Sequence, residues 1–389
     1  MGAKAFKPTL RNSHKISSFL DHPEESLTIV HVAGSNGKGS TSSMLSSILT
    51  EAGYKVGLFT SPHIKDYTER IRINGEKIPK SHVVHFINRV KTTEFDFSPS
   101  FFEITFGLAL DYFNTETCDI CIIETGLGGK FDATNIIDPI LSVITNISLE
   151  HTAMLGDTIE LIAREKAGII KTKTPVVLGE MNLNAERVIT SVAQGFESKI
   201  IKANTFRSTT TCFNLPLLGE YQSENLTTVL ACLTELNLLN FKSSNDFIQK
   251  GLDNITKNTG FAGRMQVISK EPRLIYDVSH NLAGISASLK TILETNKGKL
   301  HVIFGTSADK DLAASLALFP LSANIYLTEF INERSAKIDD FKRISKTMDF
   351  EYKEYFIDSK QALKTAKDCA SSSDTILIIG SFFLIADFL

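Results

Sequence analysis

The segment TIVHVAGSNGKGSTSSMLSSILTEAG, from Thr28 to Gly53, constrains the fold of this chain more than any other. It begins with an apolar run over residues 28–33 that is typical of a buried strand. A glycine-rich loop follows, and then a helix-forming stretch from about Ser40 to Ala52. A strand that passes through a tight loop into a helix predicts an α/β fold with a parallel sheet.

The loop in this segment has the composition of a phosphate-binding loop. Glycines let successive backbone N–H groups turn toward phosphate oxygens, and the helix start adds partial positive charge. We expect Lys38 to reach the β- and γ-phosphates of ATP and Ser40 to hold Mg²⁺. The loop departs from G-x-x-x-x-G-K-[ST], because Val32 replaces the first glycine and Gly39 follows the lysine. The alternative is a tight turn that merely exposes Lys38. The predicted nucleotide-binding residues are Gly34, Ser35, Asn36, Gly37, Lys38, Gly39 and Ser40.

The remaining chain alternates short apolar runs with helical periods, which is typical of α/β architecture. Asn74-Gly75 between two alternating segments predicts a hairpin. KNTGFAGR, Lys257–Arg264, is rich in turn-forming residues and is the candidate linker. We therefore predict a phosphate-loop ATPase-like, doubly wound sheet domain over residues 1–260 and a smaller Rossmann-like α/β domain over residues 261–389.

The individual elements follow from the same patterns. Further strands are predicted at Lys55–Phe59, Ile120–Glu124, Leu141–Ile144, Pro175–Leu178, Met265–Ser269, Leu274–Asp277, Leu300–Phe304, Asn324–Thr328 and Thr375–Ile379. Further helices are predicted at Ser81–Thr92, Phe101–Phe113, Asp157–Gly168, Tyr221–Leu239 and Asn245–Ile255.

Composition limits the classes of function. There are 41 Lys and Arg against 44 Asp and Glu, so we do not expect the chain to bind nucleic acid. No apolar run approaches the ~18 residues of a membrane span, and the polar N-terminal residues show no export signal. Five cysteines, an odd number, argue against a secreted disulfide scaffold, and we interpret Cys118 and Cys121 as packing residues. We expect a cytoplasmic monomer with no membrane partner.

The loop G-S-N-G-K-G-S is similar to the phosphate loop of the Mur ligase superfamily. The chain resembles one branch of it, the dihydrofolate synthase/folylpolyglutamate synthase family, from about Pro8 to Leu384. Only 33 residues precede Gly34, so we expect no UDP-sugar domain of the murein-building relatives. The motifs that carry the resemblance are, in order, HVAGSNGKGS, TSPHIKDYTERIRING, FFEITF, ETGLGGKFDATN, ITNISLEHTAMLGDT, EKAGIIK, GEYQSEN, AGR, DVSHN and GTSADKD.

The resemblance implies an ATP-dependent amide ligase. It would add L-glutamate to dihydropteroate, to the γ-glutamyl chain of reduced folates, or to both, through an acyl phosphate. The first domain would bind ATP and the pterin, and the second would be the glutamate-ligase domain. The implied cofactors are ATP and two Mg²⁺ ions, with a possible carbamate on Lys166.

The resemblance also implies site residues, which fall into four groups. The metal group is Ser40, Ser61, Glu124, His151 and Lys166. The residues that join the phosphate loop in binding ATP are Asn225, Arg264 and Asp277. The catalytic group is Lys38, Lys166, Asp277 and His280. The pterin group is Phe101, Phe102, Glu103, Phe131, Asp132 and Ala133, and aromatic stacking is its physical motive.

Several of these residues have a structural alternative. Lys166 could be an ordinary helix lysine paired with Glu165 or Asp157, and the two phenylalanines equally fit a helix core face. His280 and its neighbour Asn281 could cap the following helix. Departures from the family pattern occur at Lys130, Tyr221, Val278, Ser279 and Glu333, and they bear on substrate preference.

Two other functions remain open at this stage. One is a Mur-type ligase that acts on a different carboxylic acid. The other is a phosphate-loop ATPase that hydrolyses ATP only to change shape.

Overall fold

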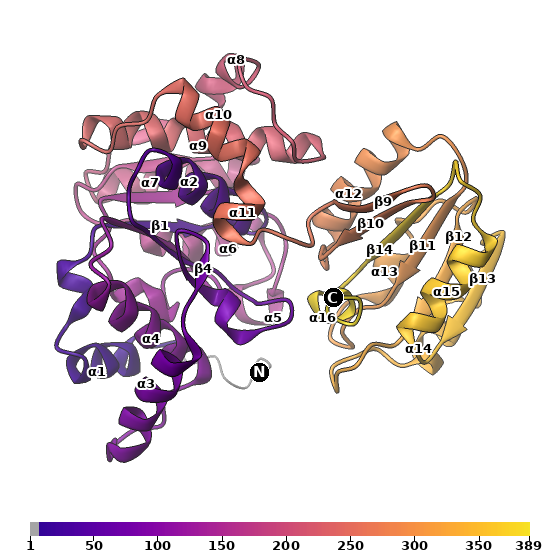
Figure 1. Ribbon diagram of the computed structural model, residues 1–389, viewed down its shortest axis with the longest axis horizontal. Coiled ribbons are helices and arrows are strands. Elements are labelled where there is room, and N and C mark those ends of the chain that lie inside the picture. Colours follow the sequence, from indigo (N-terminus) through magenta and orange to yellow (C-terminus); the bar gives the residue numbers. More distant parts are fainter. Residues whose placement is uncertain (1–7) are drawn as a thin grey trace. The chain divides into compact units, whose positions relative to one another are not determined.

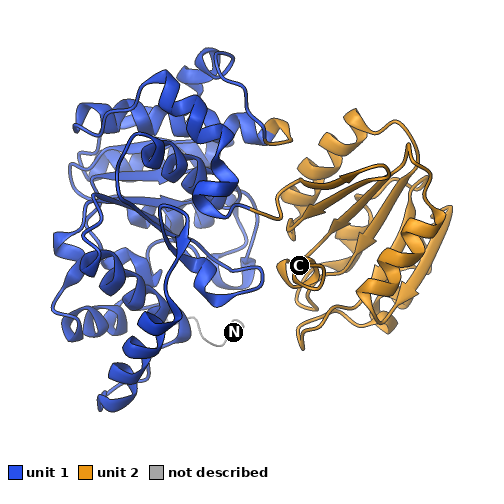
Figure 2. Ribbon diagram, in the orientation of Figure 1, with its two compact units in different colours: residues 1–216, 221–261 blue, residues 217–220, 262–389 orange. Residues whose placement is uncertain are grey.

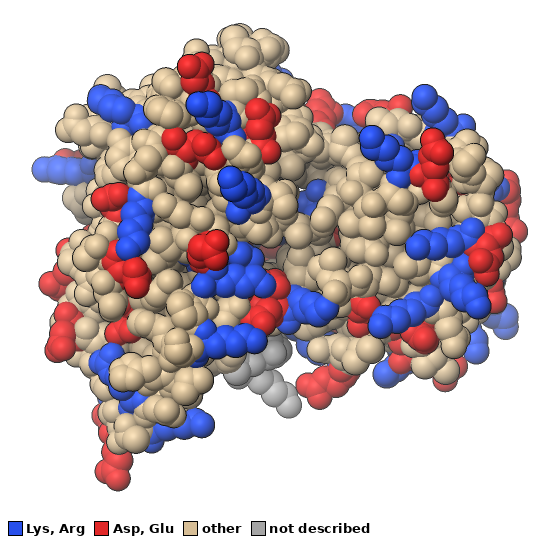
Figure 3. All heavy atoms as spheres, viewed as in Figure 1, with Lys and Arg blue, Asp and Glu red and all other residues tan. Residues whose placement is uncertain are grey.

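The computed structural model describes residues 8–389, which form two compact units (Figures 1 and 2). Unit 1 comprises the chain up to Pro216 together with Tyr221–Phe261, and unit 2 comprises Leu217–Glu220 and Ala262–Leu389. Basic and acidic side chains are interspersed over the visible face of each unit (Figure 3). Among the described residues, no helix is long and apolar enough to cross a membrane.

Unit 1 is built on an eight-stranded sheet in the order β4-β3-β2-β5-β1-β6-β7-β8. All neighbouring strands are parallel except β2-β3 and β3-β4, and β3 and β4 form the hairpin predicted at Asn74-Gly75. The strands are β1 (Ile29–Ala33), β2 (Val56–Phe59), β3 (Ile71–Ile73), β4 (Glu76–Lys77), β5 (Ile120–Glu124), β6 (Leu141–Ile144), β7 (Val176–Leu178) and β8 (Ile200–Lys202).

Both faces of this sheet are covered by helices, as the doubly wound prediction requires (Figure 1). On one face, Ile29 packs with α1 (Arg11–Phe19) and α4 (Phe101–Thr115), and Ala33 packs with α6 (Ile159–Lys166) and α7 (Leu183–Gly195). On the other face, α2 (Lys38–Glu51) contacts β1, β2 and β5. Helix α10 (Asn245–Asp253) packs on α2, and the Ser47 hydroxyl donates to the Gly251 carbonyl at 2.6 Å.

The helices of unit 1 differ from the prediction at several points. Helix α2 begins two residues earlier than expected, at Lys38, and the predicted helix over 245–255 is broken at Asn254 into two short helices. Helices α1 and α7 and strand β8 were not predicted. The helices not yet given are α3 (Lys80–Thr92), α5 (Thr152–Leu155), α8 (Arg207–Thr210), α9 (Glu220–Leu238) and α11 (Ile255–Thr259).

Unit 2 is a six-stranded sheet in the order β13-β12-β11-β14-β10-β9, parallel except for the edge strand β9. Strand β13 was not predicted, since its residues are only half buried. The strands are β9 (Gln266–Lys270), β10 (Arg273–Asp277), β11 (Leu300–Phe304), β12 (Asn324–Thr328), β13 (Tyr352–Phe356) and β14 (Thr375–Ile379). The helices are α12 (Leu282–Thr295), α13 (Leu312–Leu316), α14 (Ile338–Ser345), α15 (Ser359–Cys369) and α16 (Phe382–Ala386).

Candidate active site

Four loops of unit 1 leave the same edge of its sheet. Parallel pairing places Val32 opposite Glu124 and Ala33 opposite Ile144, and it places Phe59 opposite Ile123. The loops after β1, β2, β5 and β6 therefore meet at the carboxyl ends of the strands, where open α/β sheets bind ligands. They carry the predicted phosphate loop, Ser61, the strand end at Glu124, and His151.

The phosphate loop requires glycine at two positions. Gly34 and Gly37 have φ angles of 152° and 83°. A Cβ atom at Gly34 would lie 1.9 Å from Thr145 Oγ1, and one at Gly37 would lie 2.3 Å from Asn225 Oδ1. The loop is thus packed against the β6 loop on one side and against α9 on the other.

Part of the hydrogen bonding in this loop differs from the prediction. The backbone N–H of Ser35 donates to the Asn146 carbonyl at 2.9 Å, and that of Asn36 donates to the Asn146 side chain at 2.8 Å. These two N–H groups are therefore used inside the protein. The donors left to an anion are the N–H groups of the first turn of α2, which begins at Lys38 and cannot satisfy them internally.

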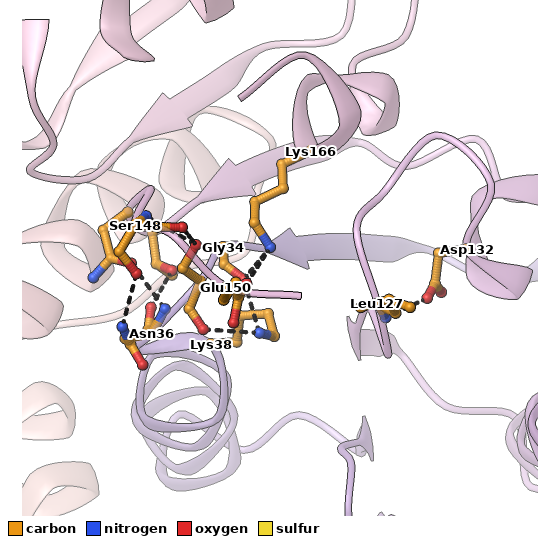
Figure 4. Close-up of polar contacts among 11 residues, drawn as sticks. Gly34, Asn36, Lys38, Leu127, Asp132, Ser148, Glu150 and Lys166 are labelled. Carbon is orange, nitrogen blue, oxygen red and sulfur yellow. Dashed lines mark hydrogen bonds and ion pairs between the residues drawn. The ribbon is translucent and has the colours of Figure 1, made fainter. Parts of the chain in front are cut away.

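Three charged side chains converge on this loop (Figure 4). Lys38 Nζ and Lys166 Nζ each donate to the Gly34 carbonyl at 2.8 Å. Lys166 Nζ also pairs with Glu150 Oε1 at 2.7 Å, and the side chain of Lys166 is only 1% exposed. Two ammonium groups and one carboxylate leave this site with a net positive charge, which suits an anionic ligand.

The electrostatics of this cluster follow from burial and proximity. Burial and, to a smaller extent, the nearby charge of Lys38 lower the pKa of Lys166 to about 8, although Glu150 opposes both. Burial alone would raise the pKa of Glu150, but the charges of Lys166, Lys38 and His151 outweigh it and hold that pKa at about 2. Glu150 is therefore a carboxylate at neutral pH.

The position of Lys166 excludes its structural alternative. The alternative of an ordinary helix lysine paired with Glu165 or Asp157 does not hold, because Lys166 is buried against the phosphate loop and its partner is Glu150. Glu150 was not predicted as a site residue. Its signal in the sequence is its place directly before His151 in the loop after β6.

The predicted metal ligands include oxygen donors that Mg²⁺ prefers. Glu124 is 3% exposed, and one of its oxygens accepts from the Ser61 backbone N–H at 3.2 Å. Ser40 is 2% exposed in the first turn of α2. Carboxylate and serine hydroxyl oxygens are both donors that fit Mg²⁺. His151, with φ of 47°, is the N-cap residue of α5.

The described residues contain no cluster of acidic, His or Cys ligands that would support this metal group. Within residues 8–389, no group of three or more His, Cys, Asp and Glu side chains could hold a metal ion. Lys166 in its ammonium form is not a ligand, because it has no lone pair to offer. The assignment of the metal group thus stays a prediction.

The predicted ATP residue in α9 lies at the phosphate loop. Asn225 is 6% exposed, donates to Gln222 Oε1 at 3.0 Å, and faces Gly37. Gln222 is fully buried, and its Nε2 atom has no hydrogen-bond partner among the described residues. Asn225 and Gln222 therefore line the phosphate loop on the side of Gly37.

The predicted residues of unit 2 gather at the carboxyl ends of β10 and β14. Asp277 is 1% exposed and accepts from the backbone N–H groups of Met265 at 2.9 Å and Ser279 at 2.7 Å. Burial raises the pKa of this carboxyl despite those bonds. Arg264 Cζ lies 5.5 Å from the ring centroid of Phe382, and the ring centroids of His280 and Phe382 are 5.8 Å apart.

Helix capping explains one residue of this group and not another. Asn281 caps α12, since its Oδ1 atom accepts from the Gly284 N–H at 2.8 Å. His280 instead contacts the Val278 carbonyl through Nδ1 at 3.0 Å. Val278 is fully buried, so this departure from the family pattern fills the core rather than the loop surface.

The predicted pterin residues at the start of α4 have different surroundings. Phe101 is 37% exposed, whereas Phe102 packs against Phe59 at 5.8 Å between ring centroids. Glu103 forms a capping box with Ser100 and accepts from Asn12 Nδ2 at 3.4 Å. The helix-core alternative therefore fits Phe102, while Phe101 remains open to a ligand.

The loop after β5 is fixed by a buried chain of hydrogen bonds. Asp132 is 4% exposed, and it accepts from Leu127 N at 2.7 Å and from Thr134 Oγ1 at 2.6 Å. Thr134 Oγ1 contacts His31 Nε2 at 2.8 Å. Because the threonine hydroxyl donates to Asp132, His31 must donate through Nε2. Phe131 and Ala133 flank this chain, and Lys130 Nζ lies 5.0 Å from the Phe131 ring centroid.

Comparisons with known proteins cover both units. The Mur ligase middle domain model matches residues 32–233, and the Mur ligase glutamate ligase domain model matches residues 263–382. The dihydrofolate synthase/folylpolyglutamate synthase of Buchnera aphidicola subsp. Schizaphis graminum is 33% identical over 92% of this chain and 86% of its own length. The chain belongs to this Mur ligase family.

Solved structures of the family agree with the fold. Escherichia coli FolC in complex with DHPP and ADP matches with a TM-score of 0.87 and 29% identity, over 100% of this chain and 94% of its own. The Yersinia pestis bifunctional folylpolyglutamate synthase/dihydrofolate synthase, complexed with AMPPNP and Mn ion, gives 0.85 and 28%, over the same shares. These matches confirm the predicted family and α/β fold.

His31 should make this family member sensitive to acid. Burial lowers the pKa of His31 to about 3. Between about pH 6.5 and pH 3, His31 is therefore protonated in the unfolded chain but not in the folded chain. Stability should fall as pH drops from 6.5 toward 3, by on the order of 3–5 kcal/mol in all. Urea unfolding between pH 7 and pH 4 measures this loss.

A matched pair of variants isolates the contribution of that ring. His31→Gln keeps a donor toward Thr134 but cannot titrate, so its stability should vary less with pH. His14→Gln, on the exposed surface of α1, is the control. Equal pH dependence in His31→Gln and the wild type would contradict the assignment.

Proposed function

We propose that this chain is an ATP- and Mg²⁺-dependent ligase that adds L-glutamate to dihydropteroate, to the γ-glutamyl chain of reduced folates, or to both. The observation that carries the proposal is the convergence of Lys38, Lys166 and Glu150 on a glycine loop at the carboxyl edge of a Mur ligase sheet. The glutamate ligase domain match over residues 263–382 supports the amide-forming half of the reaction.

The proposed reaction has two steps. An oxygen of the acceptor carboxylate attacks the γ-phosphorus of ATP, ADP leaves, and an acyl phosphate forms. The amine of glutamate then attacks the acyl carbon, phosphate leaves, and the nitrogen loses a proton. Phosphoryl transfer of this kind depends mainly on positioning and on charge neutralisation. In unit 1, the N–H groups of the first turn of α2 and the ammonium of Lys38 supply both.

We assign the metal to Ser40, Ser61, Glu124 and His151, with Lys166 as a further ligand if it carries a carbamate. A bound Mg²⁺ would polarise phosphate oxygens and offset their charge. The lowered pKa of Lys166 favours the neutral amine that carbamate formation requires. From unit 2, Arg264 and Asp277 are proposed to serve ATP, and His280 the incoming amine. Two metal ions, monomeric state and cytoplasmic location also stay predictions.

The proposed function is tested by measuring phosphate release from ATP with and without L-glutamate. Parallel reactions contain dihydropteroate, tetrahydrofolate or no acceptor. Glutamate-dependent release with both acceptors supports the bifunctional ligase, and release with tetrahydrofolate alone leaves a chain-extending enzyme. No glutamate-dependent release with either pterin would contradict the folate ligase and leave a Mur-type ligase for another acid. Release that ignores glutamate would indicate an ATPase switch.

His151 should set the metal requirement of this reaction. We expect His151→Ala to raise the Mg²⁺ concentration for half-maximal activity about 10-fold or more, because a ligand is lost. A Mg²⁺ titration at saturating ATP measures the shift. His14→Ala, on α1, is the control, and an unchanged titration in His151→Ala would remove that residue from the metal group.

A further inference from the structure

The loop between β2 and β3 carries an arginine that the proposed function does not yet use. Arg70 ends the short helix Tyr67–Arg70, and its backbone carbonyl accepts from the Thr60 N–H at 3.0 Å. Thr60 precedes Ser61, whose own N–H donates to Glu124. Arg70 is therefore anchored beside the proposed metal ligands, and the charge of Glu124 acts on its guanidinium.

The guanidinium is held on two sides. Its Nε atom donates to His63 Nδ1 at 2.8 Å, and its Cζ atom lies 5.3 Å from the ring centroid of Phe101. The ring of Tyr67 meets Phe101 edge to face at 5.6 Å. Because His63 Nδ1 accepts the bond from Arg70, the neutral ring carries its proton on Nε2.

The segment that presents Arg70 is itself rigid. Asp66 and Glu69 form a capping box, and Glu69 also accepts from the backbone N–H of Ile64 at 2.9 Å. Tyr67 is tied to α4 through a bond from its hydroxyl to Thr105 at 3.2 Å. The guanidinium is thus positioned before any ligand binds, and less entropy is lost when one does.

One edge of the guanidinium is left over. Within residues 8–389, its only hydrogen bond is the one from Nε to His63, and no side chain forms an ion pair with it. The two terminal nitrogens are arranged as a fork that matches a carboxylate. Phe101, 37% exposed beside it, offers an aromatic ring to the flat group that carries such a carboxylate.

We propose that Arg70, held by His63 and stacked on Phe101, binds the reacting carboxylate of the acceptor substrate beside Glu124. This inference rests on the proposed function and assigns the substrate contact that orients the carboxylate for phosphorylation. His63 is a positioning residue, because it acts on the substrate only through Arg70.

The test compares a ligand with its uncharged counterpart. Binding of dihydropteroate and of its methyl ester is titrated by fluorescence in the presence of ADP and Mg²⁺. Arg70→Met, which keeps most of the apolar stem, should weaken dihydropteroate binding about 10- to 100-fold and leave the ester unchanged. Arg89→Met is the matched control, since Arg89 also stacks on a phenylalanine, Phe19, and bonds to a carboxylate away from the site.

Further variants keep the inference open to refutation. Arg70→Lys keeps the charge without the fork and replaces Arg70→Met if thermal unfolding shows that the latter does not fold. His63→Asn retains an acceptor near the position of Nδ1, so it should raise the KM for the acceptor less than His63→Leu does. Neither His63 variant should change the KM for ATP.

The outcomes also separate this inference from the proposed function. If the wild type shows no glutamate-dependent phosphate release, the proposed function fails. If the wild type turns over but Arg70→Met weakens both ligands equally, or neither, Arg70 only supports packing and the inference fails. A raised KM for glutamate with an unchanged KM for the acceptor would also overturn it.

Discussion

Replacing Lys38 with alanine should lower glutamate-dependent phosphate release roughly 1000-fold or more. The ammonium of Lys38 donates to the Gly34 carbonyl in the glycine loop, and Lys38 directly follows Gly37 of that loop. Its removal takes away charge where the transferring phosphoryl group accumulates it. Initial rates at saturating ATP, dihydropteroate and glutamate measure the loss.

Two comparisons make this result specific to the loop. Lys199→Ala removes an exposed ammonium paired with Glu235 and should keep wild-type turnover. Thermal unfolding of Lys38→Ala should stay near the wild type, because Lys38 is only partly buried. Near-normal activity in a folded Lys38→Ala protein would overturn the assignment of the phosphate loop.

Replacing Lys166 with alanine should both stop turnover and destabilise unit 1. Glu150 would be left as a buried carboxylate without its main partner, which costs about 3–5 kcal/mol. Turnover should fall about 100-fold or more, since the residue also borders the phosphate loop. Urea unfolding and initial rates measure the two effects.

A double variant separates the structural role of Lys166 from its catalytic role. In Lys166→Ala with Glu150→Gln, the unpaired charge is gone, so stability should recover in part while activity does not. Added acetate or another short carboxylic acid should restore some activity to Lys166→Ala if a carbamate is the working group. Wild-type activity in the single variant would exclude the catalytic role, and wild-type stability would exclude the structural one.

The sequence predicts the framework of this protein well because the framework depends on local patterns. Apolar runs mark the buried parallel strands, and the hairpin at Asn74-Gly75 lies where turn chemistry requires. Strands β8 and β13 escape prediction because their residues are only half buried and lack a continuous apolar run. Helix α1 is short and mostly polar, so it has few apolar residues to mark it.

The site is less predictable because its chemistry depends on contacts between distant segments. Lys166 meets the phosphate loop across 132 positions of sequence, and no spacing rule relates it to Gly34. The pairing of Lys166 with Glu150 rather than Glu165 likewise depends on how α6 faces the β6 loop. The N–H groups of Ser35 and Asn36 look available in the sequence, yet the fold uses them for Asn146.

The hydrogen-bonded chain from His31 through Thr134 to Asp132 has a consequence for engineering. His31 stands three positions before Gly34, so one strand supports both the nucleotide loop and the loop after β5. The loop after β5 is therefore not an exchangeable module. A loop grafted here to accept a different acid must supply a threonine and an aspartate that form the same hydrogen-bonded chain with His31. Otherwise β1 will be disturbed, and ATP binding by the loop that follows it will weaken.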